Sequence, residues 1–469
     1  MQLNPEVVKR SLSAHSAIGL VVGVLMYMVC LTGALAALAE TFERWEQPSV
    51  EEFTSVTPSA VKHAMQQFQS EVSDEAESLW VVFPTPQLPR MHVTDGQQER
   101  FTDSDGSLGE APVEGWTHML RHLHIQLHLP QTVGLVLVSS LGAMLFGLIV
   151  SGLLAHPRLF RDAFQLRLGG SRRLEQADIH NRLSVWGLPF HLMISVTGAF
   201  YGLVGLLVIS AAAAWYDGDQ NALFDKIYGA DPVLQDQGGE VQVERAMKSL
   251  ARRYPDVSPI YVVAHKLGTA NQFIEIAATV PARLAYSEIY RFDASGSYLG
   301  NQALTSGPIG RQFLYSLYRI HFGYFGGHWT RFIWCLLGLG LTVICVSGIN
   351  VWLSKTQGLQ KLKCTWAGFV WGTPLALALS ALTSVFAAFS PLAVFLGTLG
   401  LSTLLSLRAT STQSVAFLLK LLCAGVMAAL GVAHLIAFPP ADFGEYLWPM
   451  NVGLIVTACL FVYSANAKR

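Results

Sequence analysis

The sequence predicts an α-helical polytopic membrane protein with about eight transmembrane helices and two small extracytoplasmic α/β domains. Hydrophobic residues make up 52% of the 469 residues and charged residues only 13%, whereas a soluble domain carries roughly 25% charge. Long apolar segments recur, each near the about 20 residues that a membrane-spanning helix requires, and two long polar segments interrupt them. A soluble enzyme is therefore excluded, and the net charge of −1 provides no basic field for nucleic acid.

Eight segments have the length and composition of a span. They lie at residues 16–39, 131–155, 183–214, 330–353, 366–389, 391–407, 414–437 and 447–464. The first is longer than the apolar core of a cleaved signal peptide. The chain therefore divides into the N-terminus with the first span (1–39), a first polar domain (40–128), two spans joined by an arginine-rich loop (129–214), a second polar domain (215–328), the fourth span (329–355) and a tail with four more spans (356–469).

Basic residues gather in the short segments that share one side of the membrane if eight spans cross it. These residues are Lys9, Arg10, Arg158, Arg161, Arg167, Arg172, Arg173, Arg182, Lys355, Lys361, Lys363, Lys468 and Arg469. Because short loops rich in lysine and arginine stay in the cytoplasm, we expect both termini to be cytoplasmic. Both polar domains are then extracytoplasmic.

Several functional classes have no motif in this chain. None of the six cysteines lies in a polar domain or in a CxxC arrangement, which argues against a disulfide framework and a cysteine-ligated cluster. No GxxxxGK[ST] segment and no dinucleotide-binding fingerprint occurs. The chain is therefore not expected to bind ATP or NAD itself.

The first four spans and the two polar domains form an internal duplication. His15 precedes Thr32-Gly33 by seventeen residues, and His180 precedes Thr197-Gly198 by the same spacing. Each polar domain then shows an amphipathic helix pattern, strand-like stretches and a hairpin-like segment (101–109 and 292–300). Each repeat closes with a histidine before a span that ends in Ser-Gly: His124 with Ser151-Gly152, and His321 with Ser347-Gly348. Since both units run in the same direction, the pseudo-twofold axis should lie along the membrane normal.

The four repeated histidines are candidate ligands of haem b. His15 and His180 lie at the cytoplasmic starts of spans one and three, and His124 and His321 at the outer starts of spans two and four. Imidazole is a neutral axial ligand of haem iron, whereas zinc takes about four ligands, more than one symmetric pair supplies. The pattern predicts two bis-histidine haems, one near each face of the membrane.

Other residues leave alternatives open. His191 follows His180 by about three helical turns, so it would lie on the same helix face, deeper in the membrane. His328 and His128 lie close in sequence to His321 and His124, and all three are secondary ligand candidates. Solvated or interfacial side chains are expected for His118, His122, His156 and His434. Helix packing is the preferred interpretation of Gly33, Gly152, Gly198 and Gly348.

The order and doubling of these motifs resemble the PepSY-associated transmembrane proteins, often described as iron-regulated or iron-uptake membrane proteins. The resemblance covers about residues 8–355 and includes Asp178-Ile-His180 and Pro157-Arg158. It implies two periplasmic PepSY-like domains, the inner membrane of a Gram-negative bacterium, and haem ligation by the four repeated histidines. Some members resemble haem-containing reductases of ferric siderophores. The tail at 365–469 departs from the family pattern, and its role stays open.

The leading hypothesis is transmembrane electron transfer that reduces Fe(III) in a siderophore at the periplasmic face. Iron would be released because hard oxygen ligands hold Fe(II) less tightly. The donor is separate, either a quinol or a cytoplasmic reductase, and no catalytic residue is assigned. The acidic excess of segment 40–128 favours a neutral or cationic iron complex. Two alternatives stay open: a PepSY-type binding or protease-regulating protein without redox activity, and a siderophore permease.

Overall fold

The computed structural model describes residues 4–73, 76–156, 164, 171–234, 239–440, 444 and 446–467. Some residues that the predictions use lie outside the described residues: Pro157-Arg158 of the family resemblance, and Arg161, Arg167, Lys468 and Arg469 among the basic residues that predict the orientation. The chain forms two compact units. The helical unit comprises Met1–Pro48, Glu114–Leu203 and Phe332–Arg469, and the sheet unit comprises Ser49–Val113 and Val204–Arg331.

Long apolar helices dominate the helical unit. Its elements are α1 (Pro5–Ala36), α2 (Ala39–Glu46), α4 (Trp116–Gln126), α5 (Gln131–Ala155), α7 (Arg172–Trp186), α8 (Leu188–Trp215), α12 (Gly327–Lys355), α13 (Gln360–Ala387), α14 (Pro391–Ser406), α15 (Thr412–Ala437) and α17 (Leu447–Asn466), with α8 and α12 continuing into the sheet unit. Local sequence fixes several starts. The Asn4 side chain accepts a hydrogen bond from the Glu6 amide, and Pro5 opens α1.

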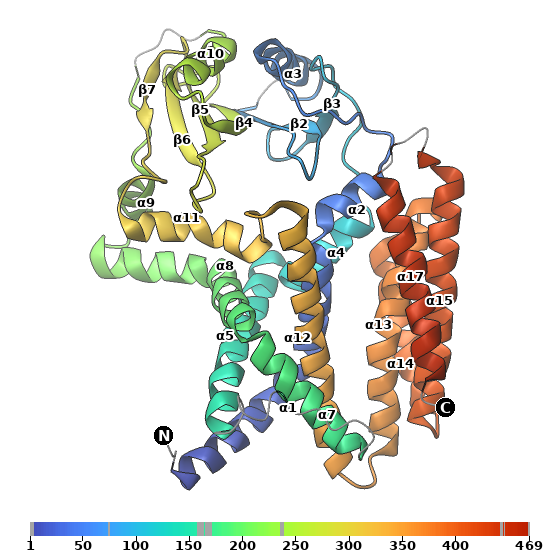
Figure 1. Cartoon of the computed structure of the whole chain (residues 1–469). Helices are drawn as coiled ribbons and strands as arrows, with labels where there is room; N and C mark the ends of the chain where they lie inside the picture. Colours follow the sequence, from blue (N-terminus) through green and yellow to red (C-terminus); the bar gives the residue numbers. More distant parts are fainter. Residues whose placement is uncertain are drawn as a thin grey trace. The chain divides into compact units, whose positions relative to one another are not determined.

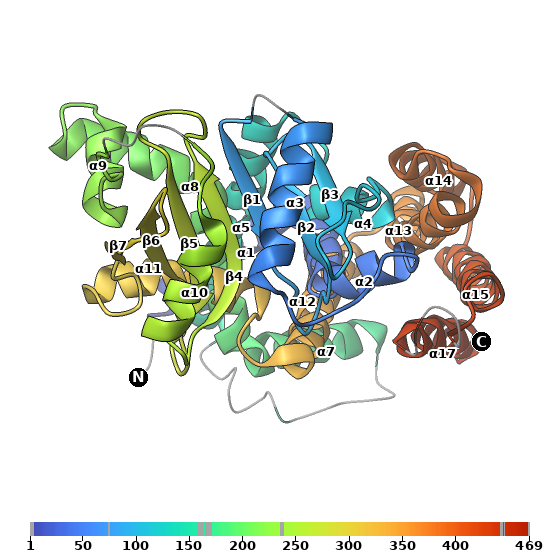
Figure 2. The ribbon, with the colours of Figure 1, turned by 90° about the horizontal axis from the view of Figure 1, so that it is seen from above.

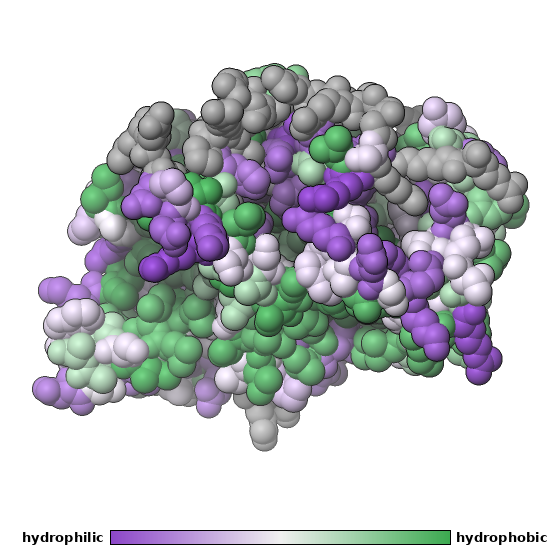
Figure 3. Space-filling model, turned by 90° about the horizontal axis from the view of Figure 1, so that it is seen from below, coloured by the Kyte–Doolittle hydropathy of each residue, from purple (hydrophilic) through white to green (hydrophobic). Residues whose placement is uncertain are grey.

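Seven helices in the described part of the chain are long and apolar enough to cross a membrane: α1, α5, α8, α12, α13, α15 and α17. The chain is thus a polytopic helical membrane protein, as predicted. The eighth predicted span, 391–407, is the 16-residue helix α14, about 24 Å long and shorter than a hydrocarbon core of about 30 Å. Large apolar side chains stay exposed on the spans, Val21 at 81% among them. Figure 3 shows broad hydrophobic areas between polar patches.

The sheet unit is built on a single antiparallel sheet. Its elements are α3 (Pro58–Glu71), β1 (Ser78–Val82), β2 (Met91–Thr94), β3 (Glu99–Thr102), α9 (Gln220–Tyr228), α10 (Val243–Arg253), β4 (Ser258–His265), β5 (Phe273–Thr279), β6 (Glu288–Asp293), β7 (Tyr298–Asn301) and α11 (Ile309–Phe322). The sequence predicts two separate domains, but the seven strands run β3-β2-β1-β4-β5-β6-β7. The strands β1 and β4 pair with Trp80 opposite Val263 and Val81 opposite Val262. Each half thereby covers the open edge of the other.

Two amphipathic helices cover the same face of this sheet (Figures 1 and 2). Val61 and Phe68 of α3 and Leu250 of α10 pack with strand residues such as Val262 and Ile276 in one core. These helices and their main strands are the ones that the apolar periodicity predicts. Burial of this face explains the strong apolar side of both helices.

The same glycine turn closes both hairpin-like segments. Gly106 and Gly296 have φ of +94° and +78°, which residues with a side chain rarely adopt. Their amides donate to the carbonyl oxygens of Asp103 and Asp293. A Cβ at either glycine would collide with backbone atoms of the covering helix, at Ala60 in α3 and near Ala246 in α10. Both hairpins are thus held against their helices by equivalent contacts.

The tail beyond residue 356 is an integral part of the helical unit. Helices α13, α14, α15 and α17 form a bundle (Figures 1 and 2), and their apolar residues share a core with α1, α2 and α4. The Tyr27 hydroxyl donates to the Val370 carbonyl oxygen at 2.7 Å, and the Trp116 Nε1 donates to that of Leu377 at 2.9 Å. Lys420, near one end of α15, donates to Ser464.

His434 is buried, so the expectation that it is solvated is wrong. Its ring stacks on Trp45 with centroids 4.2 Å apart. Its Nε2 donates to the Trp45 carbonyl oxygen at 2.9 Å, and its Nδ1 accepts from the Asn451 amide nitrogen at 3.2 Å. The Trp45 Nε1 in turn donates to the Asn451 side-chain oxygen at 2.9 Å. The side chains of His434, Asn451 and Trp45, together with the Trp45 carbonyl oxygen, form a closed hydrogen-bond ring that joins α2 to the tail.

We expect His434→Ala to lower the free energy of unfolding by about 2–4 kcal/mol, because it leaves a cavity and buried polar groups without partners. The thermal unfolding midpoint in detergent, followed by tryptophan fluorescence, measures this loss. His328→Ala, at an exposed histidine in the first turn of α12, is the matched control. Equal midpoints for both variants would show that the ring does not stabilise the fold.

Candidate functional site

His15 on α1 is held by the end of α5. Its Nδ1 lies 2.9 Å from the Leu148 carbonyl oxygen and 3.3 Å from the Ser151 hydroxyl oxygen. Because a carbonyl oxygen only accepts hydrogen bonds, Nδ1 carries the proton and Nε2 keeps its lone pair. The ring lies against Gly152, where a Cβ would come within 3.3 Å of the His15 Cε1.

His180 on α7 repeats this arrangement at the end of α12. Its Nδ1 lies 3.0 Å from the Ile344 carbonyl oxygen and 3.2 Å from the Ser347 hydroxyl oxygen. Its ring lies against Gly348, where a Cβ would come within 3.2 Å of the His180 Cε1. In both cases the carbonyl group belongs to the residue four positions before the glycine. The histidine ring therefore lies against the glycine and bonds to the carbonyl oxygen one helical turn before it.

The two histidines face each other in the helical unit. Their ring centroids are 6.2 Å apart, with an interplanar angle of 85°. A metal–imidazole bond is about 2 Å long, so this separation leaves room for one metal ion between the rings. The sequence pairs His15 with His180 by repeat equivalence and membrane depth, and the structure brings these two together.

His124 follows the same rule on α4. Its Nδ1 lies 2.9 Å from the Val29 carbonyl oxygen, and its ring occupies the space where a Cβ of Gly33 would be. Burial lowers the pKa of His124, which favours the neutral ring that a metal requires. His124 precedes the second span on a helix of its own, because Leu127 and His128, both with φ of +53°, separate α4 from α5.

His321 lies on α11 in the sheet unit and is half-buried. Its ring contacts that of Phe322, with centroids 5.1 Å apart. Like His124, it lies on a helix of its own before the span, because Gly323 with φ of +72° ends α11. Its pairing with His124 stays a prediction.

The glycines make room for histidine rings. At Gly33, Gly152 and Gly348, the atoms nearest to an added Cβ all belong to a histidine ring. The preferred helix-packing interpretation is therefore wrong for these three. For Gly198 a helix contact is present, since its carbonyl oxygen accepts from the Ser139 hydroxyl of α5 at 3.0 Å.

The secondary candidates have different surroundings. His191 does not share one helix with His180, contrary to the prediction, because Gly187 separates α7 from α8. The buried His191 ring folds back onto that glycine. The Nε2 of His128 donates to the Met119 carbonyl oxygen at 2.9 Å. His328 is exposed.

The histidines expected to be solvated or interfacial lie elsewhere. His118 and His122 lie side by side on α4, with ring centroids 4.1 Å apart. His156 is exposed at the end of α5.

The donor set fits haem iron better than zinc. Within the described residues, no three histidine, cysteine or carboxylate side chains are arranged to hold a metal ion, so His15 and His180 form a two-ligand set. Two neutral imidazoles with fixed Nδ1 protons are what haem iron takes as axial ligands. Sequence reasoning missed the supporting carbonyl groups of Leu148, Ile344 and Val29. Their position four residues before each repeated glycine is the signal that could have found them.

These features define a class of protein: a polytopic helical membrane protein with an antiparallel sheet unit and glycine-backed histidines. The chain belongs to the PepSY-associated TM region family, whose sequence profile matches residues 12–355. It is also 27% identical over 235 residues to a Pseudomonas aeruginosa protein that is named as uncharacterised. That alignment covers 47% of this chain and 59% of the relative's length.

Proposed function

We propose that this protein reduces ferric siderophores by haem-dependent electron transfer across the bacterial inner membrane. The observation that carries the proposal is the twice-built setting of His15 and His180. The Nδ1 of each ring is hydrogen-bonded to a carbonyl oxygen, and each ring lies against a glycine that has no side chain to obstruct it. The two rings face each other at a separation that admits one metal ion.

In this proposal, His15 and His180 hold one haem b, which supplies a one-electron carrier when bound. The carbonyl oxygens of Leu148 and Ile344 keep the proton on Nδ1, orient each ring and raise the basicity of Nε2. Gly152 and Gly348 let the rings approach α5 and α12. His124, with the same backing from Val29 and Gly33, supplies a ligand of a second haem, and His321 is its proposed partner.

Duplication of the first four spans explains why the settings recur. Val61, Met65 and Phe68 of α3 lie 182 residues before Val243, Met247 and Leu250 of α10. The same shift relates the two central pairs of the β1–β4 ladder, Trp80 with Val263 and Val81 with Val262. A twofold axis through this ladder supports a pseudo-symmetric dihaem protein.

The sheet unit is proposed to lie in the periplasm and both termini in the cytoplasm. This orientation is supported by the basic residues of the short segments that the structure describes, namely Arg173 and Arg182 of α7, Lys355 at the C-terminal end of α12, and Lys361 and Lys363 in the first turn of α13. It requires α14 to cross the membrane with the seven longer helices. Electrons would enter from a quinol or a cytoplasmic reductase and leave at the periplasmic face, where Fe(III) in the siderophore becomes Fe(II) and hard oxygen ligands release it.

Purified protein in lipid vesicles tests this function. With a reduced quinol as donor and a ferric siderophore outside, we expect Fe(II) to appear at an external chromophoric Fe(II) chelator, and only with haem-loaded protein. Folded protein that stays colourless after expression with ample haem would overturn the proposal and favour a PepSY-type binding protein. Uptake of the intact ferric complex without Fe(II) formation would identify a permease instead.

A further inference from the structure

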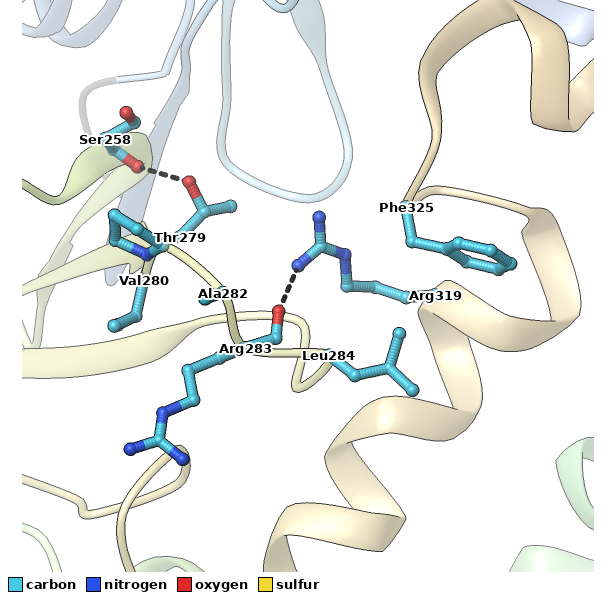
Figure 4. A pocket seen from close by; sticks show the side chains of 9 residues that line it. Ser258, Thr279, Val280, Ala282, Arg283, Leu284, Arg319 and Phe325 are labelled. Carbon is cyan, nitrogen blue, oxygen red and sulfur yellow. Dashed lines mark hydrogen bonds between the residues drawn. The ribbon is translucent and has the colours of Figure 1, made fainter.

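A cavity of about 530 Å³ opens in the sheet unit beside the C-terminal half of α11 (Figure 4). Its walls are the loop 280–284 between β5 and β6, the strand ends at Ser258 and Thr279, and the side chains of Arg319 and Phe325. Apolar groups of Val280, Leu284 and Phe325 form much of the lining. The cavity is outside the histidine sites described above.

Arg319 is the charged group of this cavity, and it is fixed in place. Its Nε donates to the Tyr324 carbonyl oxygen and its Nη1 to the Arg283 carbonyl oxygen, both at 2.8 Å. Among the residues that the structure describes, no carboxylate forms an ion pair with Arg319. A partly buried guanidinium without a counter-ion is energetically costly. An anion that enters the cavity would supply the missing charge.

Arg283 contributes its backbone but not its charge. Figure 4 shows its side chain directed away from the Arg319 guanidinium, while its carbonyl oxygen accepts from that group. Ser258 and Thr279 add polar groups at the other wall, where the Thr279 hydroxyl donates to the Ser258 carbonyl oxygen at 3.3 Å. The cavity therefore offers one preorganised guanidinium within a lining of mixed polar and apolar groups.

We infer that this cavity binds an anionic ferric chelate, with a deprotonated chelate oxygen accepting from Arg319 and aryl or alkyl parts on the apolar wall. The inference rests on the proposed function and narrows its substrate class. A guanidinium binds such oxygens through strong charge-assisted hydrogen bonds. The acidic segment 40–128 favours neutral or cationic complexes, whereas this cavity selects negative charge in the other half of the sheet unit.

The cavity is also placed to serve a redox group at His321. Arg319 and His321 lie two residues apart on α11, so they point to opposite sides of one helix. A chelate bound at Arg319 would therefore lie about one helix diameter, roughly 10 Å, from a group held by His321. Binding and electron delivery would use the two sides of the same helix.

Gallium(III) complexes test binding without reduction, because the gallium(III) ion is similar in size to ferric iron and stays trivalent. The probes are the anionic gallium(III) tris-catecholate and a neutral gallium(III) tris-hydroxamate, with the full-length protein in nanodiscs. We expect Arg319→Gln to weaken binding of the anionic probe about tenfold or more and to leave the weak binding of the neutral probe unchanged. Arg283→Gln is the matched control, and it should leave both affinities as they are.

A second variant keeps the test decisive if Arg319→Gln disturbs the fold. Ser258→Glu, at an exposed position, introduces a carboxylate into the other wall of the cavity and should exclude the anionic probe by charge repulsion with Arg319 intact. Unchanged affinity in both variants would overturn the inference. So would loss of probe binding when phosphatidylglycerol replaces zwitterionic lipid, because an anionic lipid headgroup would then be the occupant. Binding without iron reduction would instead contradict the proposed function alone.

Discussion

His180→Ala is expected to lose one haem per chain when the protein is purified from cells with ample haem. The variant removes the ring that faces His15 at 6.2 Å, and a single remaining imidazole does not hold a low-spin haem in this setting. Haem per chain, counted by a pyridine haemochrome assay against protein concentration, measures the loss. The reduced-minus-oxidised spectrum should retain only the contribution of the second haem.

Two comparisons make this result specific. His15→Ala should remove the same haem, and the double variant should lose no more than either single one, because the two residues act as a unit. His328→Ala, at an exposed histidine, should keep the full complement. If His180→Ala protein retained the haem content of the unchanged protein, the facing pair would not be a haem site.

Local patterns in the sequence predict most elements of this fold. Apolar length locates the spans, because a helix in lipid must satisfy its backbone internally. Period-3.6 and period-2 patterns locate α3, α10 and the main strands of both halves. The pairing of β1 with β4 was not predicted, since it joins Trp80 to Val263 and depends on which edges meet in space. The bounds of α14 were predicted to within one residue, and this short segment was counted as a span because its composition resembles that of a full span.

The candidate site divides in the same way. The repeat spacing predicts the pair His15 and His180, because duplicated segments occupy equivalent places. The repeat spacing does not show whether a small residue packs against another helix or against a histidine ring. Gly33, Gly152 and Gly348 were therefore assigned wrongly to helix packing. His434 was misassigned for a related reason: its partners Trp45 and Asn451 are distant in sequence, and no local pattern predicts a buried ring of hydrogen bonds.

Alanine substitutions at the three glycines should weaken haem binding in a graded order, with the largest effect at Gly33. A Cβ at Gly33 collides with the His124 ring, so the ring must move and the hydrogen bond from its Nδ1 to Val29 is lost. We expect roughly a hundredfold loss of haem affinity at the His124 site, the upper range for removal of a ligand's supporting contact. At Gly152 and Gly348 the closest ring atoms are 3.3 and 3.2 Å away, so a slight shift suffices and the loss should stay under about tenfold.

Neighbouring glycines provide the controls. Gly147 on α5 and Gly340 on α12 have nothing within 4 Å of an added Cβ, and alanine favours a helix over glycine by about 1 kcal/mol. Gly147→Ala and Gly340→Ala should therefore retain haem and unfold no earlier than the unchanged protein. Haem titration of the apoprotein and thermal unfolding give both readouts. Equal effects at all five glycines would mean that general helix packing, and not the histidine rings, sets the requirement.

A double-mutant cycle separates the collision at Gly33 from a general loss of stability. In the His124→Ala background the ring is absent, so Gly33→Ala should no longer lower the unfolding midpoint. The coupling between the two substitutions should then account for nearly all the destabilisation of Gly33→Ala alone. If Gly33→Ala is equally damaging with and without the His124 ring, the glycine serves another neighbour. The repeated pattern of a glycine and a carbonyl group four residues before it would then not be what positions the histidine rings.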